Sequence, residues 1–245
     1  MSNKIIFSVD VERDLHTNDY EGIRIGLKRF KKICDKHNVK PILFVVADCI
    51  KDNKDIFRRF IKNGWEISLH GYSHKRFDSL SYKEKESEIK KSIEIFKKHL
   101  NIKPRGFRAP QHSIDAKTLD LLKKYGFEYD SSFTPLNLLQ FFFFPKKIGL
   151  NFKSFFSPLN EYKIRLGLKE KPVASLLVPF VSLSFRIFPL FLLRAFVFKI
   201  KLFYKNPVFY AHSWDFISLK DSRIDNLFPS EKMIRKIDKI MEYEK

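Results

Sequence analysis

Cysteine is scarce in this chain: Cys34 and Cys49 are the only two among 245 residues, and they form no Cys-x-x-Cys pair. Two isolated cysteines exclude a disulfide framework and are expected to be free thiols in a reducing compartment. The first residues also lack a charged leader followed by an apolar core, which is the pattern of a secretory signal. Both absences predict a cytoplasmic protein, a location that is compatible with peripheral contact at the inner membrane face.

The chain also lacks an uncharged apolar run of the roughly 18 residues that a membrane-spanning helix needs. Residues 173–198 come nearest, but Arg186, Arg194 and two prolines interrupt them. A core strand followed by a helix over about residues 189–204 is the expected structure. An interfacial segment, with aromatic side chains in lipid and lysines at the headgroups, is an open alternative.

Phenylalanine is concentrated in one part of the chain. Between Phe133 and Phe209 lie 16 of the 27 phenylalanines, including the run Phe141–Phe144, and prolines recur throughout this region. The composition therefore predicts a phenylalanine-rich, irregular and apolar insertion over about residues 131–206 within a single domain that spans residues 1–245.

Acidic residues are outnumbered: 28 Asp and Glu face 47 Lys and Arg, which leaves a net charge of +19. The excess lysines either form solvated helix faces or attract an anionic partner such as a membrane surface, a phosphorylated lipid carrier, an acidic polysaccharide or a nucleic acid. The sequence has no recognisable nucleic-acid reader motif and no basic arm, so no nucleic acid is expected as a partner.

The first 130 residues alternate short apolar runs with longer stretches of helical periodicity. Ser81 and Glu84 form the pattern of a capping box at the start of one such stretch. Alternating strands and helices indicate βα units and a parallel sheet, either open or closed into a barrel. Strands are expected over residues 4–9, 41–47, 65–69, 106–108, 127–129 and 208–212, and helices over residues 22–37, 52–62, 81–100, 116–125 and 230–242.

Polar residues that can carry chemistry follow several of these strands. Asp10 and Glu12 end the first strand and point to the same face, because side chains alternate along a strand. His70 and His74 follow another strand, and their i, i+4 spacing on one helical turn would let both imidazoles reach one metal ion. Carboxyl ends of parallel strands are where α/β folds build their sites.

Two further strand ends complete the set. Arg108 closes a short strand, and its guanidinium there can orient a carboxylate. His212 ends an apolar strand, where it can serve as a general acid near neutral pH, and Trp214 and Asp215 follow it. Each of these residues has an ordinary structural interpretation when it is taken alone.

Taken together and in this order, the segments resemble the motifs of the polysaccharide deacetylase family, the NodB-like carbohydrate esterases. The resemblance covers about residues 4–217 and implies a distorted (β/α) barrel of about seven parallel strands. The matching segments are Ser-Val-Asp-Val-Glu at 8–12, His-Gly-Tyr-Ser-His at 70–74, Phe-Arg-Ala-Pro at 107–110, Tyr-Asp-Ser-Ser at 129–132 and Phe-Tyr-Ala-His-Ser-Trp-Asp at 209–215.

The resemblance also implies a divalent metal, most often zinc, and a role for each motif residue. It makes Asp10 the base, His212 the acid, Arg108 the residue that orients Asp10, and Glu12, His70 and His74 the metal ligands. Many members of the family have adjacent aspartates in the first motif, whereas this chain has Asp-Val-Glu, so the metal is assigned here to Glu12.

Three more residues are expected near the substrate or its oxyanion. Gln111 stands where the family often has tyrosine, and its backbone N–H is the group an oxyanion hole requires. Asp130 and Trp214 are expected at the substrate, although the tryptophan usual in the fourth motif is absent near Asp130.

The resemblance implies removal of an N-acetyl or similar acyl group from an amino sugar in a polysaccharide, an oligosaccharide or a lipid-linked glycan. Two alternatives stay open at this stage: a catalytically inactive membrane-surface or carbohydrate-binding protein on the same fold, and a phosphoesterase with the same carboxylate and histidine ligands. A third alternative, a nucleic-acid-binding protein, is disfavoured by the missing reader motif and basic arm.

Overall fold

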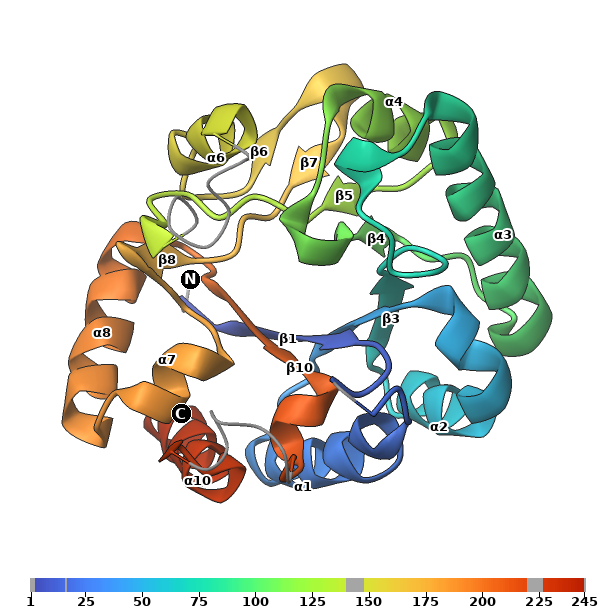
Figure 1. Ribbon diagram of the computed structural model, residues 1–245. Coiled ribbons are helices and arrows are strands. Elements are labelled where there is room, and N and C mark those ends of the chain that lie inside the picture. Colours follow the sequence, from blue (N-terminus) through green and yellow to red (C-terminus); the bar gives the residue numbers. More distant parts are fainter. Residues whose placement is uncertain (1–2, 16, 140–147, 220–226, 245) are drawn as a thin grey trace.

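A curled, eight-stranded sheet with helices on its outer side forms the body of the protein (Figure 1). The structure is a computed structural model that describes residues 3–15, 17–139, 148–219 and 227–244. The strand order is β10-β1-β2-β3-β4-β5-β7-β6. Seven of these strands run parallel, while β6 is antiparallel to β7. The predicted distorted (β/α) barrel of about seven parallel strands is therefore confirmed.

The elements of the barrel lie close to the predicted positions, with the helices packed outside the strands. The strands are β1 (Ile6–Val11), β2 (Ile42–Val45), β3 (Glu66–Leu69), β4 (Gly106–Phe107), β5 (Tyr129–Asp130), β6 (Tyr162–Lys163), β7 (Lys169–Glu170) and β10 (Val208–His212). The helices of the barrel are α1 (Leu27–His37), α2 (Ile50–Lys62), α3 (Tyr82–Leu100), α4 (Ala116–Lys124) and α10 (Ser230–Tyr243).

Local sequence signals explain where these elements begin and end. Ser81 and Glu84 form the predicted capping box at the start of α3. The strand predicted over residues 127–129 is displaced, because Gly126 adopts a φ of 74° and the Phe127 N–H bonds back to the Leu122 carbonyl oxygen. Because of this C-terminal cap of α4, β5 begins only at Tyr129 and comprises Tyr129–Asp130.

The helix predicted over residues 22–37 begins with a turn of π-helix, η1 (Gly22–Gly26). Its two glycines press against the backbone of Ser213 and Trp214, where a Cβ atom at either glycine would collide. Glycine therefore allows η1 to touch η7 (Ser213–Phe216), the short 3-10 helix that follows β10.

Residues 131–206 form the part of the chain where the sequence was least informative. The expected core strand before the helix is wrong: a hairpin and a short helix occupy that position, and Pro179, which has no N–H to donate, lies in the second strand of the hairpin. The expected helix is present as α8, while the run Phe141–Phe144 lies outside the described residues. The elements here are α6 (Ile148–Phe155), β6, η6 (Arg165–Gly167), β7, β8 (Ser175–Leu176), β9 (Val178–Pro179), α7 (Ser182–Ile187) and α8 (Leu190–Phe203).

Among the described helices, none has the length and apolar character needed to cross a membrane. The single-domain boundary at residues 1–245 and the description of residues 131–206 as an insertion stay predictions.

Candidate active site

Asp10 and Glu12 stand at the carboxyl end of β1, which lies between the edge strand β10 and β2. Asp10 pairs in register with His212 of β10 on one side and with Phe44 of β2 on the other. Val9 and Val11 are part of the apolar core, so the two acidic side chains share the opposite face of the strand. Asp10 is buried and Glu12 is half-buried.

His70 and His74 follow β3, but they do not lie on a helical turn as predicted. The segment between them is irregular: Gly71 has a φ of 79° and His74 a φ of 58°, both in the left-handed region. This loop turns the chain back on itself and brings the two imidazole rings to 5.3 Å between centroids. The rings therefore converge, although by a different backbone path from the one expected.

Glu12, His70 and His74 form a cluster whose ligand atoms all lie within 4.8 Å of one another. Nε2 of His74 lies 2.5 Å from Oε2 of Glu12. Nδ1 of His70 lies 2.8 Å from the carbonyl oxygen of Arg108, which can only accept, so Nδ1 carries the proton and Nε2 keeps its lone pair. Burial also lowers the pKa of His70, which favours the neutral imidazole.

This donor set fits a divalent cation. Two imidazole nitrogens and one carboxylate oxygen are a common ligand set of catalytic zinc, which leaves a further position open. Among the described residues, the cluster of Glu12, His70 and His74 is the one group of three histidine, cysteine or acidic side chains close enough to share an ion.

Arg108 lies beside this cluster, and its guanidinium group forms an ion pair with Asp10. Its Nη1 donates to Oδ1 of Asp10 over 2.7 Å and to Oγ of Ser8 over 3.0 Å. Its other nitrogens donate to the carbonyl oxygen and the hydroxyl of Ser131. Burial alone would raise the pKa of Asp10, but the charges of Arg108 and His70 outweigh it and bring the pKa to about 2. Asp10 is therefore ionised at neutral pH.

His212 faces the cluster from β10. Its Nε2 lies 3.9 Å from Oε1 of Glu12 and its Nδ1 lies 3.5 Å from Oδ2 of Asp215. Burial lowers the pKa of His212, but the hydrogen bond to Asp215 and the charge of Glu12 raise it to about 9. The imidazole stacks on Trp214 at 4.3 Å between centroids, and the Trp214 indole nitrogen lies 3.4 Å from Glu12.

Arg186 supports this arrangement from α7, a role that the sequence did not reveal. Its Nη2 donates to the carbonyl oxygen of Asp215 and to Oδ1 of the same residue. Asp215 in turn accepts the backbone N–H of His212 over 2.8 Å. Arg186, which interrupts an apolar stretch of the sequence, is thus buried and pairs with Asp215, the residue that orients His212.

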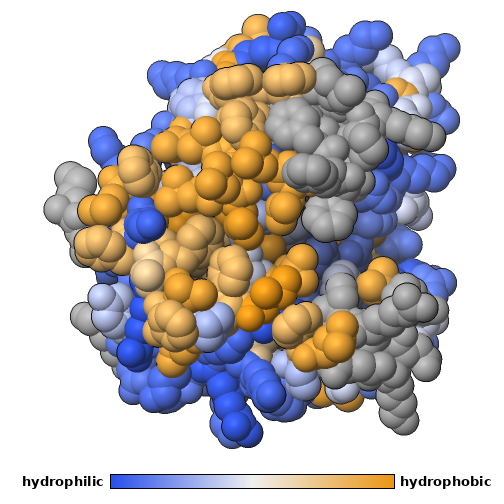
Figure 2. Space-filling view, turned by 60° about the vertical axis from the view of Figure 1, so that its left-hand side comes forward, coloured by the Kyte–Doolittle hydropathy of each residue, from blue (hydrophilic) through white to orange (hydrophobic). Residues whose placement is uncertain are grey.

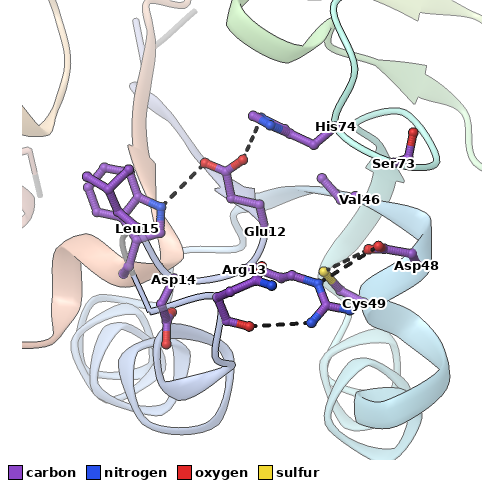
Figure 3. A pocket seen from close by; sticks show the side chains of 11 residues that line it. Glu12, Arg13, Asp14, Leu15, Val46, Asp48, Cys49, Ser73 and His74 are labelled. Carbon is purple, nitrogen blue, oxygen red and sulfur yellow. Dashed lines mark hydrogen bonds and ion pairs between the residues drawn. The ribbon is translucent and has the colours of Figure 1, made fainter.

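A cavity of 530 Å³ opens beside Glu12 and His74 (Figure 3). Figure 3 shows the side chains of Glu12 and His74 pointing toward each other at its wall. Arg13 is the arginine of a lining that also contains Glu12, Asp14 and Asp48, and it lies 3.9 Å from Asp48. The volume lies in the range of about 300–1,000 Å³ that is typical of ligand pockets.

Gln111 and Asp130 lie in different settings. Gln111 is exposed, with a φ of 52°, in the turn that follows Arg108. Asp130 is fully buried, where its carboxylate accepts the Ser132 hydroxyl over 2.7 Å and contacts the carboxyl group of Glu170. The oxyanion role of Gln111 and the substrate roles of Asp130 and Trp214 stay predictions.

The carboxyl groups of Asp130 and Glu170 form a buried acidic pair. Burial and the charge of Asp130 raise the pKa of Glu170 well above its value of 4.5 in an unfolded chain. A group with a raised folded pKa contributes stability below its unfolded pKa and loses that contribution as the pH rises through its folded pKa. Folding should therefore become less favourable as the pH rises above about 4.5.

Glu170→Gln is expected to remove this dependence. The amide keeps an acceptor for the Phe133 N–H, which Oε1 of Glu170 accepts over 3.1 Å, and it carries no charge to repel Asp130. The melting temperature of the variant should exceed that of the wild type by more at about pH 8 than at about pH 5. Thermal unfolding followed by circular dichroism at both pH values is the measurement, and an equal difference at the two would contradict the raised pKa of Glu170.

Glu88 of α3 anchors the loop that carries His74, a contact the sequence did not predict. Oε2 of Glu88 accepts the backbone N–H groups of Tyr72 and Ser73, each over 3.0 Å. Its Oε1 accepts the Ser73 hydroxyl over 2.8 Å. Glu88 is buried, so this carboxylate fixes the two residues that lie between the left-handed Gly71 and His74.

Glu88→Gln is expected to weaken zinc binding by roughly 10- to 100-fold, the usual cost of losing a residue that orients a metal ligand. The neutral amide oxygen is a weaker acceptor for the two backbone N–H groups than the charged carboxylate, so the loop would be held less firmly. Isothermal titration with zinc measures the change. Glu94→Gln, on an exposed position of the same helix, is the matched control and should bind zinc like the wild type. Unchanged affinity in Glu88→Gln would show that the loop holds His74 without this carboxylate.

The curled parallel sheet and the acid–histidine cluster at its strand ends define the class of the protein: a carbohydrate-esterase-like fold with a candidate site for a divalent cation. Residues 22–129 match the family model described as polysaccharide deacetylase. Over these residues the chain is similar to the polysaccharide deacetylases.

Curated relatives share part of the chain. A peptidoglycan deacetylase of Helicobacter pylori is 29% identical over 131 residues, which cover 51% of this chain and 43% of the relative. A peptidoglycan deacetylase-like protein of Gibberella zeae is 32% identical over 111 residues, covering 44% of this chain and 33% of the relative. The chain thus spans less than half the length of these relatives.

Solved structures share the fold over nearly the whole chain. A structure from Mycobacterium smegmatis assigned to the polysaccharide deacetylases has a TM-score of 0.67 at 18% identity, covering 98% of this chain and 85% of that one. A CE4 family pseudoenzyme from Bacillus anthracis has a TM-score of 0.58 at 13% identity, covering 99% of this chain and 62% of that one. At these identities the likeness shows the fold alone, and the second protein shows that this fold also occurs without activity.

Proposed function

We propose that this chain is a metal-dependent hydrolase that removes an N-acetyl group from an amino sugar of a glycan. One observation carries the proposal: Glu12, His70 and His74 converge at the strand ends next to Asp10, which Arg108 holds, while His212 faces the same cluster. Similarity of residues 22–129 to the polysaccharide deacetylases supports the reaction class, and the cavity beside Glu12 and His74 supplies room for a sugar.

Glu12, His70 and His74 would hold the cation, and their nitrogen and oxygen donors suit zinc. When bound, such a cation supplies Lewis-acid activation of water and of the acyl carbonyl group. The chain itself prepares this site: Arg108 fixes the ring of His70 through its carbonyl oxygen and fixes Asp10 through its guanidinium.

Asp10 and His212 would each carry out one of the two proton transfers. Asp10 is ionised and buried, so it is available to accept a proton from the attacking water. His212 is held protonated by Asp215, so it can donate a proton to the departing amine, which is otherwise a very poor leaving group. The backbone N–H of Gln111 is the proposed donor to the oxyanion.

Acetate release from N-acetylated chitooligosaccharides and peptidoglycan fragments tests this function. The zinc-loaded protein should release acetate, and Asp10→Asn should retain zinc but work roughly 10²–10⁴-fold more slowly. A wild-type protein that retains about one zinc ion and releases no acetate from any of these glycans would favour the inactive, carbohydrate-binding alternative. The lipid-linked form of the substrate and a cytoplasmic location are further parts of the proposal, motivated by the composition alone.

A further inference from the structure

Helix α8 presents apolar side chains on two opposite faces. Leu193, Val197 and Ile200 lie on the inner face and are fully buried in the core. Phe191, Phe198 and Leu202 lie on the opposite face, where they are 70%, 58% and 65% exposed. With Ala195 these residues follow the i, i+4, i+7, i+11 spacing of a single helical stripe. A second apolar stripe that stays exposed on a helix whose first apolar face is already buried is expected to have a partner.

The stripe is part of a wider apolar surface. Figure 2, which brings the side of α8, α7, β8 and α6 forward, shows hydrophobic side chains gathered there into a broad area. Large side chains that contribute to the exposed surface of these elements are Phe156 after α6, Leu177 between β8 and β9, Ile187 of α7, and Leu192 and Phe203 of α8. Contiguous apolar areas of this kind mark interaction sites in soluble proteins.

The positive charge around the outer stripe of α8 indicates which kind of partner this surface binds. From Lys171 to Trp214 the sequence contains no Asp or Glu, although it contains six Lys and Arg residues. On α8 itself, exposed Arg194 lies to one side of the outer stripe and exposed Lys199 to the other. Long cationic side chains at the margins of an apolar face can reach lipid headgroups while the apolar residues enter the bilayer.

A second copy of this chain fits the surface less well. Two such faces brought together would oppose like charges, on a protein whose net charge is +19. An anionic lipid surface, in contrast, complements both the apolar stripe and its cationic margins.

We propose that the outer face of α8 docks on an anionic lipid bilayer, with the helix lying in the plane of the interface. Phe191, Phe198 and Leu202 enter the acyl boundary, and Arg194 and Lys199 contact headgroup phosphates. The protein is held at the surface, since none of the described helices spans a membrane. This inference goes beyond the proposed deacetylation and does not depend on it.

Flotation of the full chain with vesicles tests the proposal. The wild type should float with vesicles of phosphatidylglycerol and phosphatidylcholine in equal amounts, and less with phosphatidylcholine alone. The double variant Phe191→Ser/Phe198→Ser should lower the partition coefficient by roughly 10- to 100-fold, because two phenylalanines no longer leave water. Arg194→Glu/Lys199→Glu should lower it by roughly 10-fold or more and remove most of its salt dependence.

Leu166→Ser is the matched control, since Leu166 is 66% exposed but lies in η6, which packs against α4. It should float like the wild type, and melting curves should show that each variant is folded. Sedimentation in the absence of lipid tests the alternative that this surface binds a second copy of the chain. A wild type that dimerises through this face and does not float would assign the surface to a second copy, and a monomer that does not float would overturn the proposal outright.

Discussion

His74→Ala is expected to lose zinc and to lose turnover by more than roughly 100-fold, a larger effect than removing a residue that only orients a ligand. His74 supplies one of three donors, and its Nε2 lies 2.5 Å from the Glu12 carboxylate. The side chain is half-buried at the cavity wall, so its removal leaves no large void in the core. The loss of metal should therefore occur in a protein that remains folded.

Metal analysis after dialysis, together with acetate release at saturating zinc, measures both effects. His99→Ala is the matched control: His99 lies on α3, where it belongs to no acid–histidine cluster, and its replacement should leave zinc content and rate unchanged. His74→Ala with wild-type zinc content and wild-type rate would remove this residue from the ligand set. Loss of rate with full zinc content would instead make it a substrate-binding residue.

The strand-end residues could be predicted from the sequence because parallel strands impose a shared geometry. Asp10, His70, Arg108 and His212 each end or directly follow an apolar run that became a strand, and neighbouring parallel strands bring their carboxyl ends to one edge. Their convergence needed no knowledge of long-range contacts beyond the strand order.

The contacts that orient these residues could not be predicted in the same way. Glu88 occupies a position on a lysine- and glutamate-rich helix, where a buried carboxylate has the same sequence signature as a solvated one. Arg186 pairs with Asp215 across 29 positions of chain, within a region whose composition indicated only apolar packing. His74 has a left-handed φ and follows Ser73, whose backbone N–H binds Glu88 of a distant helix, and the sequence around His74 contains no sign of this tertiary contact.

The outer stripe of α8 shows a different limit. Its periodicity is visible in the sequence, because apolar residues occur on both faces of the expected helix. Which face packs on the core depends on tertiary contacts such as that of Phe196 with Phe180, and only the fold decides this. The structure separates the buried face from the exposed one and so turns an ambiguous apolar segment into a defined surface.

Arg108→Ala is expected to lower the free energy of unfolding by roughly 3–5 kcal/mol, the usual cost of removing one partner from a buried ion pair. Arg108 is fully buried, and its guanidinium donates hydrogen bonds to Asp10, Ser8 and Ser131. Its removal leaves the Asp10 carboxylate buried without its closest counter-charge. Urea unfolding followed by circular dichroism gives the stability difference.

Arg105→Ala is the matched control for this prediction. Arg105 makes an equally well-formed pair with Glu128, with contacts of 2.8 and 2.7 Å, but both side chains are exposed. Solvent screens such a pair, so its loss should cost about 0–1 kcal/mol. An Arg108→Ala protein as stable as Arg105→Ala would show that Asp10 does not depend on the buried guanidinium.

The carboxylate and the arginine can be separated by a second substitution. The double variant Arg108→Ala/Asp10→Asn no longer contains the unpaired Asp10 carboxylate. It should therefore recover part of the stability that Arg108→Ala loses, with a coupling free energy between the two residues of roughly 0.5–3 kcal/mol. Arg108→Lys should fall between the wild type and Arg108→Ala, because an ammonium group can approach Asp10 but cannot donate in the same plane to Ser131 as well. Strictly additive effects in the cycle would mean that Arg108 stabilises the strand ends through its other contacts, and the ionised state of Asp10 would then need a different cause.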